Sequence, residues 1–139
     1  MIDWQKAEEI ASTADVATPK DCAVVYSVSF LPTKENRDKA MAYVANTAEA
    51  MTIEQTECGK KLLELGLGKS ASNEDEGRKM AQIWSMASVR YIAAASGNIT
   101  AFVSGADPRS VFMTTELPAI LRNPAIYTIN NIEKHRFRV

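Results

Sequence analysis

The sequence is poor in the residues that build metal sites and disulfide frameworks. It contains one histidine and two cysteines. His135 alone cannot form a multi-histidine centre, and Cys22 and Cys58 form no CxxC pair, so we expect no bound metal. Two cysteines cannot form a disulfide framework, and we expect both to be ordinary buried thiols.

The sequence also lacks a charge imbalance and a long apolar run. Its 16 basic and 17 acidic residues give a net charge of −1, which indicates no basic surface for nucleic acid. No stretch approaches the roughly 18 apolar residues of a membrane span, and no signal-peptide pattern opens the chain. We therefore expect a cytosolic protein or a module of a larger one, with no membrane span and no nucleic-acid partner.

What the sequence does contain is typical of one globular domain over residues 1–139. The apolar fraction is 46% and the charged fraction 24%, which is ordinary for a protein with a hydrophobic core. A helix is expected over residues 3–14, where Asp3 can cap the first turn. Because Thr18 and Pro19 separate this helix from the rest, we expect residues 1–20 to form a peripheral helical arm.

The apolar spacing in the remaining chain predicts helices and short strands. Thr52, with Gln55 three residues later, has the capping-box pattern and predicts a helix that ends at Gly66 or Gly68. In chain order we expect a strand or extended segment over 22–30 (with a helix as the alternative), helices over 34–50, 52–68 and 73–95, a strand over 99–103, a short helix over 116–122 and a strand over 125–129.

The stretch from Ile83 to Glu116 organises the second half of the chain. In the expected helix, Trp84 and Ser88 are four residues apart and share one face. A β-prone run, a glycine loop and Glu116 follow, and Pro118 is tolerated in the first turn of a helix. We expect an α+β fold, in which N-terminal helices precede a small, mostly parallel sheet with flanking helices and a right-handed crossover.

Four separated stretches resemble the ADP-ribosyl cyclase / NAD glycohydrolase family, in that family's order, and cover roughly residues 22–132. VVYSVSF resembles its LLWSRI segment, and MTIEQTECGKKLLELGL resembles its FTLEDTLLGYLADDL segment. IWSMASVRYIAAAS resembles its FWxxxSRRFAEAA helix, and SVFMTTE resembles its TFGSVE segment. The resemblance implies an ADP-ribosyl cyclase-like fold over the single domain. It also implies that NAD⁺ (or NADP⁺) is the substrate and that no cofactor is needed.

The resemblance also assigns site residues. Its catalytic positions fall on Glu116, Trp84 and Glu54. The residues that it places around the substrate are Tyr26, Ser27, Ser88, Phe112, Ser110 and Arg109.

The chain departs from the family pattern at several positions. The acid after the signature glutamate is Gln55, the second stacking tryptophan is Tyr26, and the threonine before the phenylalanine is Val111. The family's disulfides are absent, as expected for a bacterial toxin-like member that acts in reducing cytoplasm. Despite these changes we still expect cleavage of the glycosidic bond. The ratio of hydrolysis to cyclisation stays open.

Elementary chemistry supports the same roles. Cleavage of the nicotinamide–ribose bond passes through an oxocarbenium-like state, which a preorganised carboxylate such as Glu116 can stabilise or attack. Trp84 can stack on the cationic nicotinamide ring. Glu54 can hold the nicotinamide amide, and Ser88 can hydrogen-bond to ribose or phosphate.

Each of these residues also has a purely structural interpretation. Glu116 could be an acid favoured by a helix N-terminus, and Glu54 an ordinary solvated acid near a helix start. Trp84 and Phe112 could be core residues, and Ser88 a small residue between helix and sheet. Tyr26 could be a half-buried strand tyrosine, while Ser110 and Arg109 could be solvated rather than bound to a pyrophosphate.

Three functions are compatible with the sequence. The first is an NAD⁺-cleaving hydrolase that yields nicotinamide and ADP-ribose, with some cyclic ADP-ribose. As a toxin or effector of the contact-dependent inhibition type, it would be secreted or delivered as part of a larger protein, act in the target-cell cytoplasm and have a cognate immunity protein. The second is an ADP-ribosyltransferase that modifies a macromolecule, and the third is a non-catalytic, immunity-type binding protein.

Overall fold

The computed structural model of the protein describes residues 2–27, 35–69, 71–103 and 112–137. One sheet has the strand order β1-β2-β3-β4, and its first three strands run parallel while β4 is antiparallel to β3. The strands are β1 (Val24–Tyr26), β2 (Gly97–Phe102), β3 (Ile126–Ile129) and β4 (Ile132–Glu133). The expected α+β fold with a small, mostly parallel sheet is therefore confirmed.

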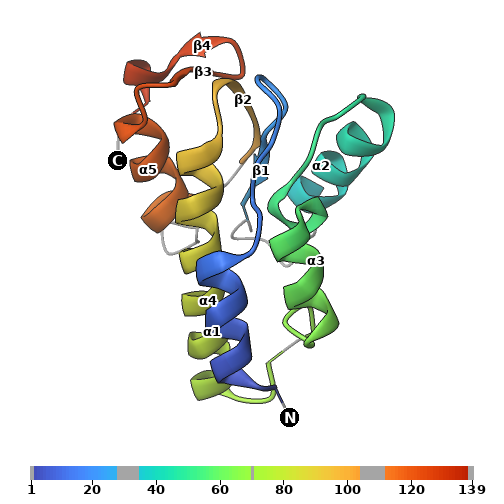
Figure 1. Ribbon diagram of the computed structural model, residues 1–139. Helices are drawn as coiled ribbons and strands as arrows, with labels where there is room; N and C mark the ends of the chain where they lie inside the picture. The colour runs from blue at the N-terminus through green and yellow to red at the C-terminus, as the bar shows by residue number, and fades with distance from the viewer. Residues whose placement is uncertain (1, 28–34, 70, 104–111, 138–139) are drawn as a thin grey trace.

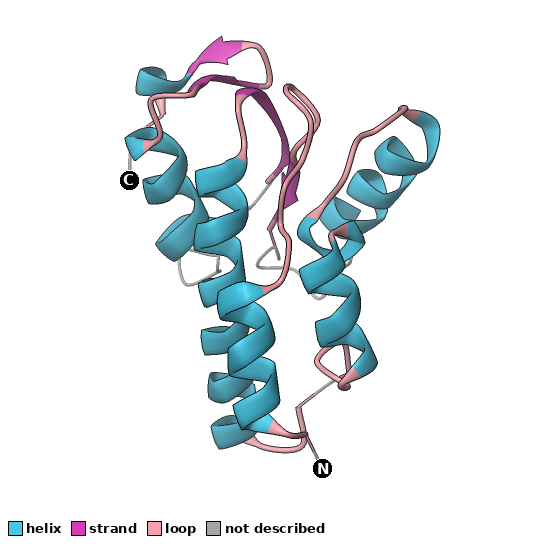
Figure 2. Cartoon of the chain, in the orientation of Figure 1, coloured by secondary structure: helices cyan, strands magenta, loops and turns pink. Residues whose placement is uncertain are grey.

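Helices make up most of the molecule, and the strands gather near one end of it (Figure 2). The α-helices are α1 (Trp4–Thr13), α2 (Glu35–Asn46), α3 (Glu57–Glu64), α4 (Glu74–Ala94) and α5 (Leu117–Arg122). Shorter helical turns are η1 (Ile53–Gln55), the π-helical η2 (Phe112–Glu116) and η3 (Lys134–Arg136). Within the described part of the chain, no helix is long and apolar enough to cross a bilayer.

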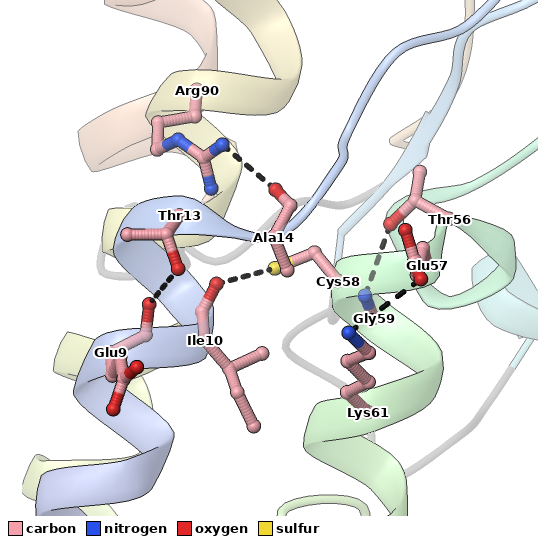
Figure 3. A network of polar contacts seen from close by, with 10 residues as sticks. All are labelled: Glu9, Ile10, Thr13, Ala14, Thr56, Glu57, Cys58, Gly59, Lys61 and Arg90. Atoms are coloured by element: carbon pink, nitrogen blue, oxygen red, sulfur yellow. Dashed lines mark hydrogen bonds and ion pairs between the residues drawn. The ribbon is translucent and has the colours of Figure 1, made fainter.

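The N-terminal helix is not the peripheral arm that the sequence suggested. Ala7 and Ala11 are fully buried, and α1 packs against α3 and α4. Figure 3 shows the contacts at its C-terminal end, where Arg90 of α4 donates a hydrogen bond of 2.7 Å to the Ala14 carbonyl. The thiol of Cys58 in α3 lies 3.5 Å from the Ile10 carbonyl. The small side chains of Ala7 and Ala11 allow α1 to pack closely against its neighbouring helices. The break in the helical pattern at Thr18 and Pro19 gives no indication of this packing.

The helix expected from Thr52 onward is divided into two elements. The capping box forms around η1, and Thr56 then adopts an extended conformation and caps α3. Its hydroxyl donates to the Ile53 carbonyl at 2.6 Å and accepts from the Gly59 amide at 3.0 Å. Gly59 is required here because a Cβ would collide with the Ile53 carbonyl oxygen. Thr56 and Gly59 thus set the angle between η1 and α3.

The hydroxyl of Tyr91 connects α4 to two other segments. Its single proton is shared between the carbonyls of Met51 at 2.6 Å and Val24 at 3.0 Å, and its oxygen accepts from the Val24 amide at 3.0 Å. The Tyr91 side chain is buried. These bonds fix α4 against β1 and against the residues that lead into η1.

The β3–β4 hairpin was not predicted. Asn130 and Asn131 form its turn with positive φ angles of 53° and 65°, a conformation that asparagine tolerates. The side chain of Asn130 also pairs with the backbone of Ala101 in β2, at 2.8 and 3.0 Å. The adjacent asparagines are therefore a turn signal that apolar periodicity alone does not reveal.

Candidate active site

A pocket of about 500 Å³ lies between the β1 end of the sheet, α2, η1, α4 and η2. Its volume is within the usual range of small-molecule sites, roughly 300–1,000 Å³. Every predicted site residue that the structure describes lines this pocket: Tyr26, Ser27, Glu54, Trp84, Ser88, Phe112 and Glu116. Arg109 and Ser110 lie outside the described residues, so their placement stays a prediction. Figure 1 shows that the contributing elements come from distant parts of the chain.

Glu116 is a buried acid, with only 6% of its surface exposed. It ends the π-helical turn η2 directly before α5, and its side chain makes no capping hydrogen bond to that helix. Glu116 therefore does not cap α5 by a side-chain hydrogen bond, although its place directly before the helix still allows a favourable interaction with the helix dipole. The helix expected over 116–122 is confirmed as α5, which begins one residue later at Leu117, directly after the π-helical turn.

Burial raises the pKa of Glu116 to about 7. A hydrogen bond from Ser88 lowers the pKa, and the charge of Glu54 raises it further. The carboxylate form of Glu116 is therefore high in energy in the unliganded pocket, and a cation placed beside it would favour ionisation. A perturbed acid inside a pocket is a common property of catalytic carboxyl groups.

Glu54 is the second acid of the pocket and is held by Tyr26. The Tyr26 hydroxyl donates to both carboxylate oxygens, at 2.9 and 3.0 Å. Burial raises the pKa of Glu54, whereas the Tyr26 hydrogen bond and the charge of Arg37 lower it. Burial and the charge of Glu54 raise the pKa of Tyr26, so the phenol keeps its proton and stays a donor. The half-buried Glu54 is thus a fixed hydrogen-bonding group rather than an ordinary solvated acid.

Trp84 and Ser88 lie one turn apart on α4, as the spacing predicted. The indole N–H of Trp84 donates to the Leu67 carbonyl at 3.1 Å, and the half-buried ring packs against the core while also lining the pocket. Ser88 is 3% exposed and bonds to Glu116. Both residues therefore combine a structural role with a place in the pocket wall.

Ser27 and Phe112 complete the set of predicted residues. Ser27 is buried at the end of β1, where its amide donates to Phe102 at 3.1 Å and its carbonyl accepts from Asn36 at 2.9 Å. Phe112 is buried, belongs to the core and lines the pocket. It therefore has both the structural role and the place at the pocket that the sequence left open.

Sequence reasoning missed several pocket residues, of which Arg37 is chemically the most important. Arg37 lies in the first turn of α2 and is exposed, and a hydrogen bond joins it to Tyr26. Nothing in the sequence distinguishes it from the other charged residues of that helix. Among the described residues, no three histidines, cysteines or acids gather as a metal site, and Cys22 and Cys58 are free thiols.

Comparison with known proteins gives matches among solved structures. No protein-family model and no curated protein sequence matches the chain. Porcine CD38 in complex with a covalent intermediate, ribo-F-ribose-5′-phosphate, has a TM-score of 0.63 at 18% identity, over 91% of this chain and 66% of that one. Aplysia cyclase in complex with substrate NGD and product cGDPR has a TM-score of 0.57 at 22% identity, over 80% of this chain.

A mutant of ADP-ribosyl cyclase is similar at a TM-score of 0.56 and 21% identity. This chain spans about half the length of the cyclases, because the match covers 48% of each of them. At such identities the likeness concerns the fold, and the chain has the fold of ADP-ribosyl cyclase and CD38.

Proposed function

We propose that this protein cleaves the nicotinamide–ribose bond of NAD⁺ and releases nicotinamide and ADP-ribose. The observation that carries the proposal is the buried Glu116, whose carboxyl group shares one pocket with Ser88, Trp84 and Glu54. The fold supports it, since a solved structure of the same fold contains a cyclase with a substrate and its product.

Glu116 stabilises the charge that develops when the bond breaks. The electron pair of the C–N bond leaves with nicotinamide, and positive charge remains on the anomeric carbon and ring oxygen of ribose. A carboxylate held beside that carbon lowers the energy of this state, or forms an ester with it that water then hydrolyses. Water supplies the hydroxyl group of ADP-ribose and loses a proton.

The cationic substrate also explains how an acid with a pKa of about 7 can act as a carboxylate. The nicotinamide ring of NAD⁺ carries a positive charge, and its binding beside Glu116 favours the ionised form. Ser88 keeps the carboxyl group oriented through its hydrogen bond. The acid is therefore ionised by the substrate that it helps to cleave.

Trp84 and Glu54 bind the nicotinamide end of the substrate. The indole ring stacks on the cationic nicotinamide, while Glu54 accepts a hydrogen bond from its carboxamide. Because Tyr26 already donates to both oxygens of Glu54, the carboxamide must share these acceptors. If ADP-ribose is held folded after nicotinamide has left, the adenine ring can attack in place of water, which gives some cyclic ADP-ribose.

Product analysis tests the activity directly. Purified protein is incubated with NAD⁺, and the mixture is separated by chromatography, with Glu116→Gln as the matched variant. We expect one nicotinamide for each ADP-ribose or cyclic ADP-ribose that is formed, with ADP-ribose as the major product. Release of nicotinamide with neither free nor cyclic ADP-ribose would instead indicate transfer to a macromolecule, and unchanged NAD⁺ would refute the proposal.

The biological setting that we propose is depletion of NAD⁺ in a target cell by a delivered toxin, with an immunity protein that protects the producer. Enzymatic hydrolysis is catalytic, so few molecules suffice to exhaust a cellular pool. Induced expression in a bacterial host should arrest growth and lower NAD⁺ for the wild type but not for Glu116→Gln. Arrest of growth by both proteins would contradict an origin in NAD⁺ cleavage.

A further inference from the structure

Acidic side chains outnumber basic ones among the described residues that line the pocket. Glu54 and Glu116 supply two acids, and Arg37 is the single cationic side chain among the described lining residues. The two acids suit the positively charged nicotinamide of NAD⁺. They are unsuited to its pyrophosphate, which carries two negative charges and would be repelled at short range.

Arg37 is held at the pocket by its neighbours in α2. The side-chain amide of Asn36 donates to the Ser27 carbonyl at 2.9 Å, and Ala40 is fully buried one turn later. These two contacts fix the first turn of α2 against the end of β1. The Arg37 side chain is consequently exposed to solvent and lines the pocket beside the Tyr26–Glu54 pair.

We infer that Arg37 binds the pyrophosphate of the dinucleotide and makes the pocket selective for phosphorylated nicotinamide ribosides. This inference rests on the proposed function. A guanidinium group presents five N–H donors in a planar fork that fits two phosphate oxygens. Its exposed position leaves it accessible to the half of the substrate that extends away from the buried acids, and its charge offsets their repulsion.

A purely structural role for Arg37 makes a different prediction. If the residue acts only by holding Tyr26 and Glu54, its removal weakens every substrate that carries nicotinamide, with or without phosphate. A role in phosphate binding weakens the phosphorylated substrates more than the riboside. The two roles therefore separate on NAD⁺, nicotinamide mononucleotide and nicotinamide riboside.

The kinetic test compares these three substrates with wild type, Arg37→Gln, Arg37→Lys and the control Arg78→Gln. Arg78 is exposed at the start of α4, does not line the pocket and undergoes the same chemical change. For Arg37→Gln we expect kcat/KM to fall about 10- to 100-fold on NAD⁺ and on the mononucleotide, the typical effect of losing a charge-assisted hydrogen bond. Activity on nicotinamide riboside should fall several-fold less than activity on NAD⁺, because only the contacts of Arg37 with Tyr26 and Glu54 are lost there, and Arg37→Lys should recover part of the loss.

Equal losses on nicotinamide riboside and NAD⁺ would overturn the inference, as would a loss in Arg78→Gln as large as that in Arg37→Gln. A calorimetric titration with ADP-ribose separates this inference from the proposed function, because it needs no cleavage. Weaker binding by Arg37→Gln in a protein that leaves NAD⁺ intact would support the phosphate site and refute the activity. Equal binding of ADP-ribose by wild type and Arg37→Gln would refute the phosphate site.

Discussion

Replacing Glu116 with glutamine should reduce activity and increase stability at the same time. The amide keeps the shape of the side chain and removes its charge. Loss of a preorganised charge at the reacting carbon typically costs about 10²- to 10³-fold in turnover, and more if the acid is also the nucleophile. The opposite effect on stability follows from the burial of the same group.

The pKa of Glu116 rises from an ordinary value of 4.5 to about 7 in the fold, chiefly because of burial. The folded protein thus binds this proton more tightly than the unfolded chain. Stability from this group is fully present below about pH 4.5 and is lost as the pH rises through about 7. A shift of this size corresponds to about 3 kcal/mol of unfolding free energy.

The variant carries no charge at this position at any pH, so it escapes that loss. We expect urea denaturation at pH 8 to give a higher unfolding free energy for Glu116→Gln than for wild type, by up to about 3 kcal/mol. Near pH 4.5 the two proteins should differ little. Glu8→Gln, an exposed acid on α1, is the control and should change neither activity nor stability.

The opposite result would refute this reasoning. If Glu116→Gln is less stable than wild type at pH 8 and still cleaves NAD⁺ at the wild-type rate, the acid has a structural role. A variant that is less stable and also inactive would contradict the expected gain in stability but not the catalytic role. An inactive variant of higher stability is the expected outcome.

Three further predictions concern the pocket and its surroundings. The kcat/KM for NAD⁺ should rise with pH through about 7, because ionised Glu116 is the active form, and a profile that is flat between pH 5.5 and 8.5 would contradict that assignment. Trp84→Ala should lower both NAD⁺ affinity and turnover and cost about 3 kcal/mol of stability, since the ring packs on the core, whereas Trp84→Phe should retain part of each in kinetic and urea assays. Lys134→Met should lower the unfolding free energy by about 1–3 kcal/mol without changing kcat. The reason is that the buried Lys134 ammonium group donates a hydrogen bond of 2.6 Å to the Asn123 carbonyl at the end of α5. An unchanged unfolding free energy in urea would show that this hydrogen bond contributes nothing to stability.

Local signals in the sequence were sufficient for most of the helix boundaries. Asp3 caps α1, and Gly66 follows the end of α3 with a φ of 99°, as expected from the sequence. Asn73, a preferred capping residue, caps α4 at the expected start of that helix. The division between η1 and α3 was not predictable in this way, because Thr52 and Thr56 are both good caps and only tertiary contacts decide where each turn ends. The integration of α1 was missed for the same reason.

The sequence predicted those pocket residues that belong to recognisable motifs. Trp84, Ser88 and Glu116 lie in one segment of the chain, and their arrangement follows from helical spacing and the motif order. Arg37 was missed because its importance depends on the distance between α2 and the Tyr26–Glu54 pair. No sequence pattern specifies that distance.

The three hydrogen bonds of the Tyr91 hydroxyl have a consequence for how the pocket can change shape. Trp84 and Ser88 share a helix with Tyr91, while Val24 and Met51 adjoin Tyr26 and Glu54 respectively. Separating these walls would break the buried hydrogen bonds of the Tyr91 hydroxyl, which is energetically costly. We therefore expect conformational adjustment to a ligand to be concentrated in α2, with α4, β1 and the segment before η1 moving little relative to one another.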